Sequence, residues 1–285
     1  MNAVVNSQSI SPLPIQKMKT IQSIFSAVLL LMLSACAQTS GVGASGNENS
    51  PALMPFDDKL EALSPAYTGQ VCGDIVGDVK KLRLTKDEFE ATADYQSRVG
   101  QMANAGLRGQ LRLSDTMAFV VPRNVLEFNY DADKAQMSGS FEIGDYSQLS
   151  SAKTEILSSR TLNQMYEGAS KGRTRSASGI EVYVDLFQYR VCALNIANTR
   201  AWQRVRPEFN ITADEARLAK SRLRILYVGH LVPQFLQSYL HVRSPSASRM
   251  TEGTYAGNAL VFQLEQIWVF DQGTGRVYQK IKPSN

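Results

Sequence analysis

Residues 258–270 read NALVFQLEQIWVF, and this segment predicts a long β-strand. Its large apolar residues fall mostly at alternate positions, as they do in a strand with one buried face; they are Leu260, Phe262, Leu264, Ile267 and Phe270. Residues 271–275, DQGTG, are typical of a tight turn, and residues 276–281 predict a final strand,. The C-terminal end of the chain is therefore expected to form a β-hairpin.

Further strands are predicted upstream of this hairpin. Alternating apolar residues indicate strands at 119–130, with a break at Pro122, and at 137–143, joined by a turn at 131–134,. The same alternation predicts strands at 180–186, 189–194 and 223–227. Residues 151–179 are polar and are expected to be partly helical. They end in a basic loop at 171–176, either a solvated loop or a contact for lipid phosphate or peptidoglycan,.

Helices are predicted at three places. Residues 67–79 carry apolar side chains every fourth position, together with glycines at the same spacing,. Capping boxes at residues 85–88 (TKDE) and 212–215 (TADE) predict helices over 86–104 and from 213 to about Ser221,. Together these elements predict an α+β fold, with antiparallel sheet and a few packed helices, in one domain or in two poorly separated ones that divide near residue 110.

A candidate targeting signal lies near the N-terminus. Residues 21–35 are apolar and uncharged, Lys17 and Lys19 precede them, and the run ends in Leu33-Ser34-Ala35-Cys36. A basic head, a short apolar middle and small residues at the end describe a secretory signal, and the run is shorter than the roughly 20 residues of a membrane span. Residues 33–36 resemble the lipobox of bacterial lipoproteins. The alternatives are an ordinary secretory signal or an uncleaved apolar anchor.

The lipobox resemblance implies that Cys36 receives a lipid and becomes the mature N-terminus. It also implies the outer membrane, because Ala37 rather than Asp follows the cysteine. The expected organisation is a signal peptide at 1–35, a flexible tether of small and polar residues at 36–50, and a periplasmic domain at 51–285. Translation beginning at Met18 would make a more compact signal.

Two cysteines remain after Cys36, and they are Cys72 and Cys192. An even number of cysteines in an oxidising compartment predicts a disulfide bond between them. Two separate buried thiols are the alternative.

Composition and motifs restrict the chemistry of the chain. With 30 Lys and Arg against 26 Asp and Glu, it is too weakly basic to predict a nucleic acid partner,. Its two histidines, His230 and His241, are not at metal-ligand spacing, and the sequence contains no H-E-x-x-H and no G-x-S-x-G motif,. We therefore expect no metal, no cofactor and no catalytic residues.

A basic and aromatic cluster lies at residues 200–206. Arg200, Arg204 and Arg206 surround Trp202, and such a set can bind a sugar, an anionic lipid or a protein,. A surface loop with one half-buried tryptophan is the alternative. Residues 89–95, FEATADY, resemble a segment of uncharacterised proteobacterial envelope lipoproteins.

The expected function is that of a non-enzymatic lipid-anchored envelope protein, facing the periplasm, with a scaffold or assembly role and an envelope protein as partner. The second hypothesis is a small-ligand or cell-wall binding module, which predicts an aromatic-lined pocket near Trp202 or Trp268. The third is a hydrolase, which requires one of the histidines beside a serine and a carboxylate in one cleft.

Overall fold

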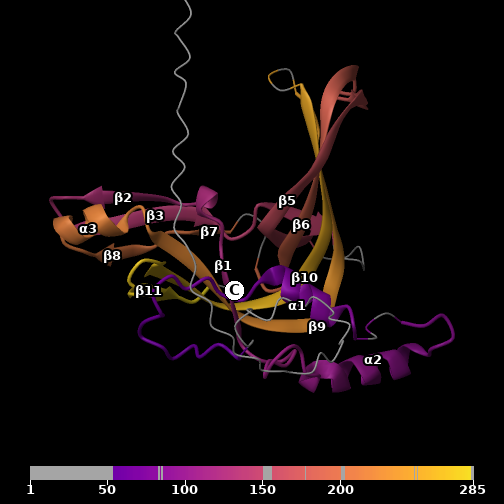
Figure 1. Ribbon diagram of the computed structural model, residues 1–285, viewed down its shortest axis with the longest axis horizontal. Helices are drawn as coiled ribbons and strands as arrows, with labels where there is room; N and C mark the ends of the chain where they lie inside the picture. The colour runs from indigo at the N-terminus through magenta and orange to yellow at the C-terminus, as the bar shows by residue number, and fades with distance from the viewer. Residues whose placement is uncertain are drawn as a thin grey trace, which may run out of the picture. The chain divides into compact units, whose positions relative to one another are not determined.

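Four long strands form the centre of the protein, and they are β5 (Ile156–Arg175), β6 (Glu181–Ile196), β9 (Leu223–Arg243) and β10 (Thr251–Asp271) (Figure 1). The computed structural model describes residues 54–283, apart from residues 83, 85, 150–155, 177, 200–202, 247 and 249. A strand rises about 3.3 Å per residue, so the 21 residues of β9 or β10 span roughly 70 Å,. The described residues belong to one compact unit, Asn49–Asn285.

In the described part of the chain, seven strands form one sheet in the order β1-β9-β10-β6-β5-β4, and β11 also pairs with β10. The shorter members are β1 (Met117–Val120), β4 (Tyr146–Leu149) and β11 (Val277–Ile281). Most neighbours are antiparallel, but β6 and β10 run parallel, so the sheet is mixed rather than wholly antiparallel as predicted. Whether two paired strands run parallel is determined by the tertiary structure, because alternation along a strand does not encode its direction.

A second sheet, four-stranded within the described residues, contains β2 (Glu127–Asp131), β3 (Gln136–Glu142), β7 (Arg204–Val205) and β8 (Glu208–Asn210). Strands β2 and β3 form the predicted hairpin. Sheet dominates this α+β fold.

The helices are shorter than predicted. They are α1 (Cys72–Val79), α2 (Thr92–Gln101) and α3 (Ala213–Ala219), with 3-10 turns η1 (Met102–Asn104) and η2 (Arg123–Val125). The cap of α3 is confirmed, because the Thr212 hydroxyl accepts a hydrogen bond from the Glu215 amide at 3.4 Å. Helix α2 begins at Thr92 instead of 86, since the Asp87 carboxylate accepts from the Phe89 amide at 2.9 Å and holds a turn before it,. Thr85 lies outside the described residues.

Helix α1 also begins later than expected. Gly69 has a left-handed φ of +70° and forms a bridge to Phe119 of β1, and Val71 is extended, so the helix does not include them. A left-handed φ is open to glycine without steric cost. The glycine spacing at 69, 73 and 77 therefore does not mark one helix.

The prediction of partial helix over residues 151–179 was wrong for the part that the structure describes. Residues Ser158 to Arg175 pair with β6 as strand β5, which takes in most of the basic loop predicted at 171–176. Much of this strand lies outside the core and is solvated on both faces. It therefore lacks the apolar alternation that usually identifies a strand.

The core lies between the two sheets and helix α1. Its largest fully buried side chains include Trp268, Tyr227, Phe119 and Phe262. Cys72, the first residue of α1, is bonded to Cys192 of β6 with an S–S distance of 2.04 Å, as predicted. This bond attaches the first helix to the middle of the main sheet. In the described residues, no helix is long and apolar enough to cross a membrane.

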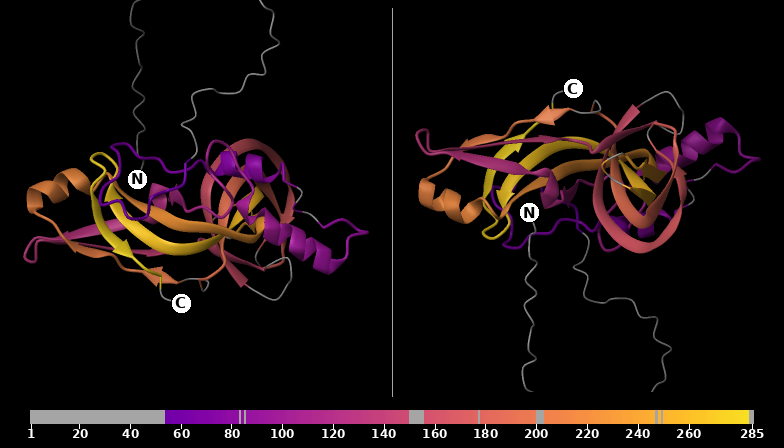
Figure 2. Two further views of the ribbon diagram at one scale, coloured as in Figure 1. Left: turned by 90° about the horizontal axis from the view of Figure 1, so that it is seen from below. Right: turned by 90° about the horizontal axis from the view of Figure 1, so that it is seen from above.

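The long strands continue past the core. All of Val191–Ile196 of β6 and most of residues 259–271 of β10 are buried, but burial drops at 181–190 and at 251–258. Strand β9 changes in the same way after Leu231. We call the outer part of these strands (residues 163–190 and 237–258) the arm. It rises from the body in Figure 1, and Figure 2, which looks along it, shows that its sheet is strongly curled.

The boundary between body and arm is marked by a break in β9. Leu231 is opposite Phe262 but Leu236 is opposite Leu260, so β9 has extra residues at this point. Two of them, Gln234 and Phe235, have positive φ angles of 77° and 23°. The bulge bends β9, as bulges do, and buries Phe235 in the core.

Candidate binding pocket at the base of the arm

One row of aromatic side chains crosses all four strands of the arm. His241 of β9 is opposite Tyr255 of β10, which is opposite Tyr189 of β6, which is opposite Tyr166 of β5. The Tyr189 and Tyr255 rings stack with centroids 4.8 Å apart and planes 7° apart. His241 lies 5.9 Å from Tyr255, and Tyr166 lies 5.8 Å from Tyr189. Neighbouring rings on one sheet face stabilise the pairing of their strands, so the row holds the curled sheet in register.

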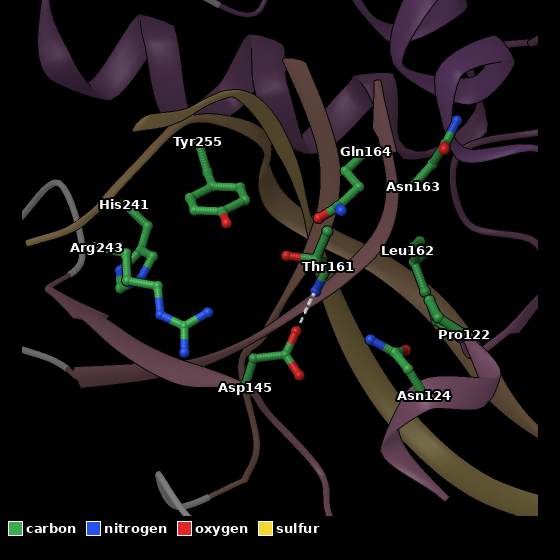
Figure 3. A pocket seen from close by; sticks show the side chains of 10 residues that line it. All are labelled: Pro122, Asn124, Asp145, Thr161, Leu162, Asn163, Gln164, His241, Arg243 and Tyr255. Carbon is green, nitrogen blue, oxygen red and sulfur yellow. Dashed lines mark hydrogen bonds between the residues drawn. The ribbon is translucent and has the colours of Figure 1, made fainter. Parts of the chain in front are cut away.

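A cavity of about 650 Å³ opens beside this row (Figure 3). Three elements contribute to it, namely the arm, the turn η2 and the loop between β3 and β4. Its described lining consists of Pro122, Asn124, Asp145, Thr161, Leu162, Asn163, Gln164, His241, Arg243 and Tyr255. Most of these side chains carry a hydrogen-bonding group, and its size lies in the usual range for small-molecule sites.

A bulge in β5 decides which side chains point into the cavity. Register shifts between Thr161 and Asn163, so that Gln164 joins Thr161 on the face of Tyr255 while Asn163 lies opposite Cys192 on the other face. In Figure 3 the amide of Asn163 accordingly points away from the other side chains. Thr161, Gln164 and Tyr255 therefore supply the polar groups of the strand wall.

A buried arginine holds the opposite wall. Arg160 is 2% exposed, and its guanidinium pairs with the Asp145 carboxylate and donates to the carbonyls of Glu142 and, at 3.0 Å, Ile143. The other Asp145 oxygen accepts from the Thr161 amide at 3.0 Å. A buried charge is tolerated when its hydrogen bonds are satisfied in this way. The pair fixes the loop before β4 against the arm.

A chain of polar side chains supports the base of the cavity. The Ser159 hydroxyl donates to Asn195, the Asn195 amide donates to Gln237, and the Gln237 amide donates to Gln234, each at 2.7 Å. This chain connects the buried part of β5 to the bulge in β9. Beside it, the hydroxyls of Thr161 and Tyr239 lie 3.3 Å apart. Satisfied networks of this kind rigidify a site.

The electrostatics of the cavity centre on His241 and Arg243. Burial, and then the nearby Arg243 charge, lower the pKa of the His241 imidazole below its usual 6.5, while the Asp145 charge opposes this shift,. His241 is therefore neutral near pH 7 and can both donate and accept a hydrogen bond. In Figure 3 the Arg243 guanidinium points from β9 toward the middle of the cavity.

The predicted binding cluster is only partly described. Arg200 and Trp202 lie outside the described residues, as does Cys36. Arg204 lies on β7 and pairs with Glu142 at 2.9 Å, and Arg206 is exposed between β7 and β8. Neither arginine lines the cavity beside Tyr255.

The residues considered for other functions lie elsewhere. Trp268 is fully buried, its indole donates to Gln266 at 2.8 Å, and it does not line the cavity beside Tyr255. His230 Nδ1 lies 3.0 Å from the Glu265 carboxylate, away from the cavity that His241 lines. The described lining of that cavity contains no serine and no cysteine. Within the described residues, no cluster of three His, Cys, Asp or Glu side chains is placed to hold a metal ion.

Comparison of the chain with known protein families, with curated proteins and with solved structures finds no match.

Sequence reasoning missed the cavity. Its signal in the sequence is a period of two in polar and aromatic residues, as in Tyr239, His241 and Arg243 of β9 and Phe187 and Tyr189 of β6. This period predicts strands, but only the register of four strands brings Tyr166, Tyr189, Tyr255 and His241 into one row.

Proposed function

We propose that this protein is a non-enzymatic, lipid-anchored scaffold of the bacterial cell envelope, and that its arm holds an envelope protein. The lipobox at residues 33–36 and the tether after it support attachment through Cys36 to the outer membrane, with the folded unit in the periplasm. A tether allows an anchored domain to find a partner nearby.

The observation that carries the docking proposal is the outer face of the arm, opposite to the tyrosine row. Leu240, Ala256, Arg190 and Met165 are opposite one another across the four strands, and Val242 follows Leu240 on the same face. Leu240 is 64% exposed, Met165 52% and Val242 45%. Large apolar side chains that share one exposed face mark interaction sites in soluble proteins. The ion pair of Arg190 with Glu167 lies within this row, so the face combines apolar and charged groups, as surfaces that bind proteins do,.

Site-specific photo-crosslinking in cells tests this proposal. A crosslinker at position 240 or 242 is expected to give the same discrete adduct with an envelope protein, identified by mass spectrometry. A crosslinker at Leu218 of α3, which is equally exposed at 64%, is the matched control and is expected to give none. Val242→Asp is expected to remove the adduct formed at 240 without lowering the melting temperature. Adducts that are identical at all three positions, or that survive this substitution, would contradict the docking face.

The anchor has its own test. Labelled palmitate is expected to enter the wild-type protein and not the Cys36→Ser variant, and only the wild type is expected to fractionate with the outer membrane. A soluble, unlabelled wild-type protein would contradict the anchor and leave the docking face to be judged by crosslinking alone.

A second function is favoured by the cavity beside Tyr255, namely the binding of a small polar ligand. Here the supporting observation is a preformed, 650 Å³ cavity whose walls are held by the Arg160–Asp145 pair and the aromatic row. Binding of a ligand there is expected to shift the NMR signals of Tyr255 and Gln164 during a titration. The two functions use opposite faces of the arm and are compatible.

A further inference from the structure

We propose that the cavity beside Tyr255 binds an acidic saccharide of one or two rings, and that Arg243 holds its carboxylate. This inference rests on the second proposed function, the binding of a small ligand, and adds the class of ligand.

The charge of the cavity favours an anion. Asp145 is the only acidic side chain of its described lining, and both of its oxygens are engaged, by Arg160 and by the Thr161 amide. Arg243 is exposed and, among the described residues, forms no ion pair. Its guanidinium therefore offers the cavity a positive charge and a planar set of donors. That geometry matches a carboxylate with two parallel hydrogen bonds.

The remaining lining favours a ligand with many hydroxyl and amide groups. The amides of Asn124 and Gln164, the hydroxyls of Thr161 and Tyr255 and the neutral imidazole of His241 surround the cavity (Figure 3). Together they provide donors and acceptors in several directions, which the hydroxyls of a sugar require. An apolar ligand would take the exposed amides of Asn124 and Gln164 out of water without replacing their hydrogen bonds, which costs free energy,.

The volume and the aromatic row exclude a bare anion as the best occupant. An ion of the size of acetate would leave most of the 650 Å³ filled by water. A sugar ring fills the space between Gln164 and Arg243, and its C–H groups can pack against the Tyr255 ring beside them. The stacking of Tyr255 on Tyr189 keeps that ring fixed before a ligand arrives, which reduces the entropic cost of binding.

Matched ligands test the inference. The mature full-length protein is titrated by calorimetry and by NMR with N-acetylglucosaminyl-N-acetylmuramic acid and with the same disaccharide whose carboxylate is converted to a carboxamide. The acid is expected to bind at least tenfold more tightly than the amide. Arg243→Gln is expected to remove this preference and leave amide binding unchanged. Arg190→Gln, on the opposite face of the same arm, is expected to keep the preference.

The outcomes separate the possible failures. Equal binding of acid and amide, or an unchanged preference in Arg243→Gln, overturns the assignment of Arg243 to a carboxylate while ligand binding stands. Absence of binding by both disaccharides overturns the saccharide class, and the crosslinking result at 240 then decides the scaffold role independently. Acetate that competes as well as the acid disaccharide would show an adventitious anion site and overturn the inference. The melting temperature of each variant confirms that it is folded.

Discussion

Arg160 is one of the largest fully buried side chains of the protein, and it determines the shape of the cavity from behind. Its three hydrogen bonds join the end of β3, the loop before β4 and the carboxylate of Asp145. A buried arginine of this kind contributes mainly by positioning the groups it contacts, since the desolvation of its charge offsets much of the attraction.

Removal of the Arg160 charge is therefore expected to be costly. Arg160→Met removes the positive partner of the Asp145 carboxylate and one donor from each of two carbonyls, and the free energy of unfolding should fall by about 3 kcal/mol,. Urea unfolding measures this change. Arg204→Met removes an exposed ion pair with Glu142 and should change stability by at most about 1 kcal/mol. Similar losses of unfolding free energy in the two variants would show that the buried Arg160–Asp145 pair stabilises the protein no more than an exposed ion pair does.

His241 predicts a dependence of stability on pH. Because burial and Arg243 lower its pKa below 6.5 in the folded protein, the unfolded chain binds a proton at a higher pH than the folded chain does. This contribution to the free energy of unfolding is fully present above pH 6.5. It is lost as the pH falls from 6.5 to the lower pKa of the folded state.

His241→Gln removes this titration, since glutamine does not ionise. Thermal unfolding of both proteins from roughly pH 8 to pH 5 should show that the wild type loses more stability than the variant below pH 6.5. The facing charges of Arg243 and Asp145 remain in the variant, so they cancel in the comparison. Parallel pH profiles would contradict the lowered pKa.

At the scale of elements, the disulfide and the aromatic row connect segments that are distant in the sequence. Cys72 and Cys192 are 120 residues apart, and their bond joins α1 to β6 at the level where the core ends and the arm begins. Cross-linking a loop of this length restricts the unfolded chain strongly.

Loss of the disulfide is expected to destabilise the whole unit. The double variant Cys72→Ser, Cys192→Ser should lower the free energy of unfolding by up to about 5 kcal/mol in the chain-entropy model. Chemical denaturation measures the loss, and a mass shift on alkylation only after reduction checks the bond itself. Alkylation of both thiols without reduction would contradict the pairing.

Close approach of β10 to β6 depends on a glycine. A Cβ at Gly257 would overlap the carbonyl oxygen of Val191, whereas a Cβ at Gly168 of β5 would meet nothing within 4 Å. Gly257→Ala is therefore expected to destabilise the protein by about 1–3 kcal/mol and to shift the NMR signals of the Tyr189–Tyr255 pair. Gly168→Ala is the matched control and should leave both unchanged. Equal effects would argue against close packing at Gly257.

At the scale of the whole molecule, body and arm have different roles. Most buried residues lie at and below the level of Val191, Tyr239 and Ala259, while the side chains proposed to contact a partner lie above it. An arm that adds little buried surface contributes little to stability, so its length calls for a functional explanation.

Shortening the arm tests this division. The rows of the sheet allow both hairpins to be cut at one level, below the row of Met165, Arg190, Ala256 and Leu240, with a tight turn replacing residues 165–190 and another replacing residues 240–256. The shortened protein is expected to keep a cooperative unfolding transition within a few degrees of the wild type and to lose the crosslinked partner from the remaining surface. Loss of cooperative folding would show that the arm belongs to the core instead.

Much of the secondary structure could be predicted from local patterns. Thr212 caps α3, the hairpin of β2 and β3 follows its alternation, and the apolar run at 258–270 lies within β10. These features depend on residues that are close in the sequence. A capping side chain bonds the amides next to it, and the spacing of apolar residues reflects the local backbone geometry. The pairing of Cys72 with Cys192 also follows from composition, because only two cysteines remain beside Cys36.

Tertiary structure alone decided the mixed sheet, the arm and the cavity. Residues 163–175 are mostly solvated on both faces, so their pattern contains no strand signal, and only pairing with β6 makes them a strand. The row of His241, Tyr255, Tyr189 and Tyr166 exists because two hairpins meet along β6 and β10 in one register. Such a register is set by long-range packing. A single sequence encodes the side chains of this site, but their meeting depends on contacts between residues far apart in the chain.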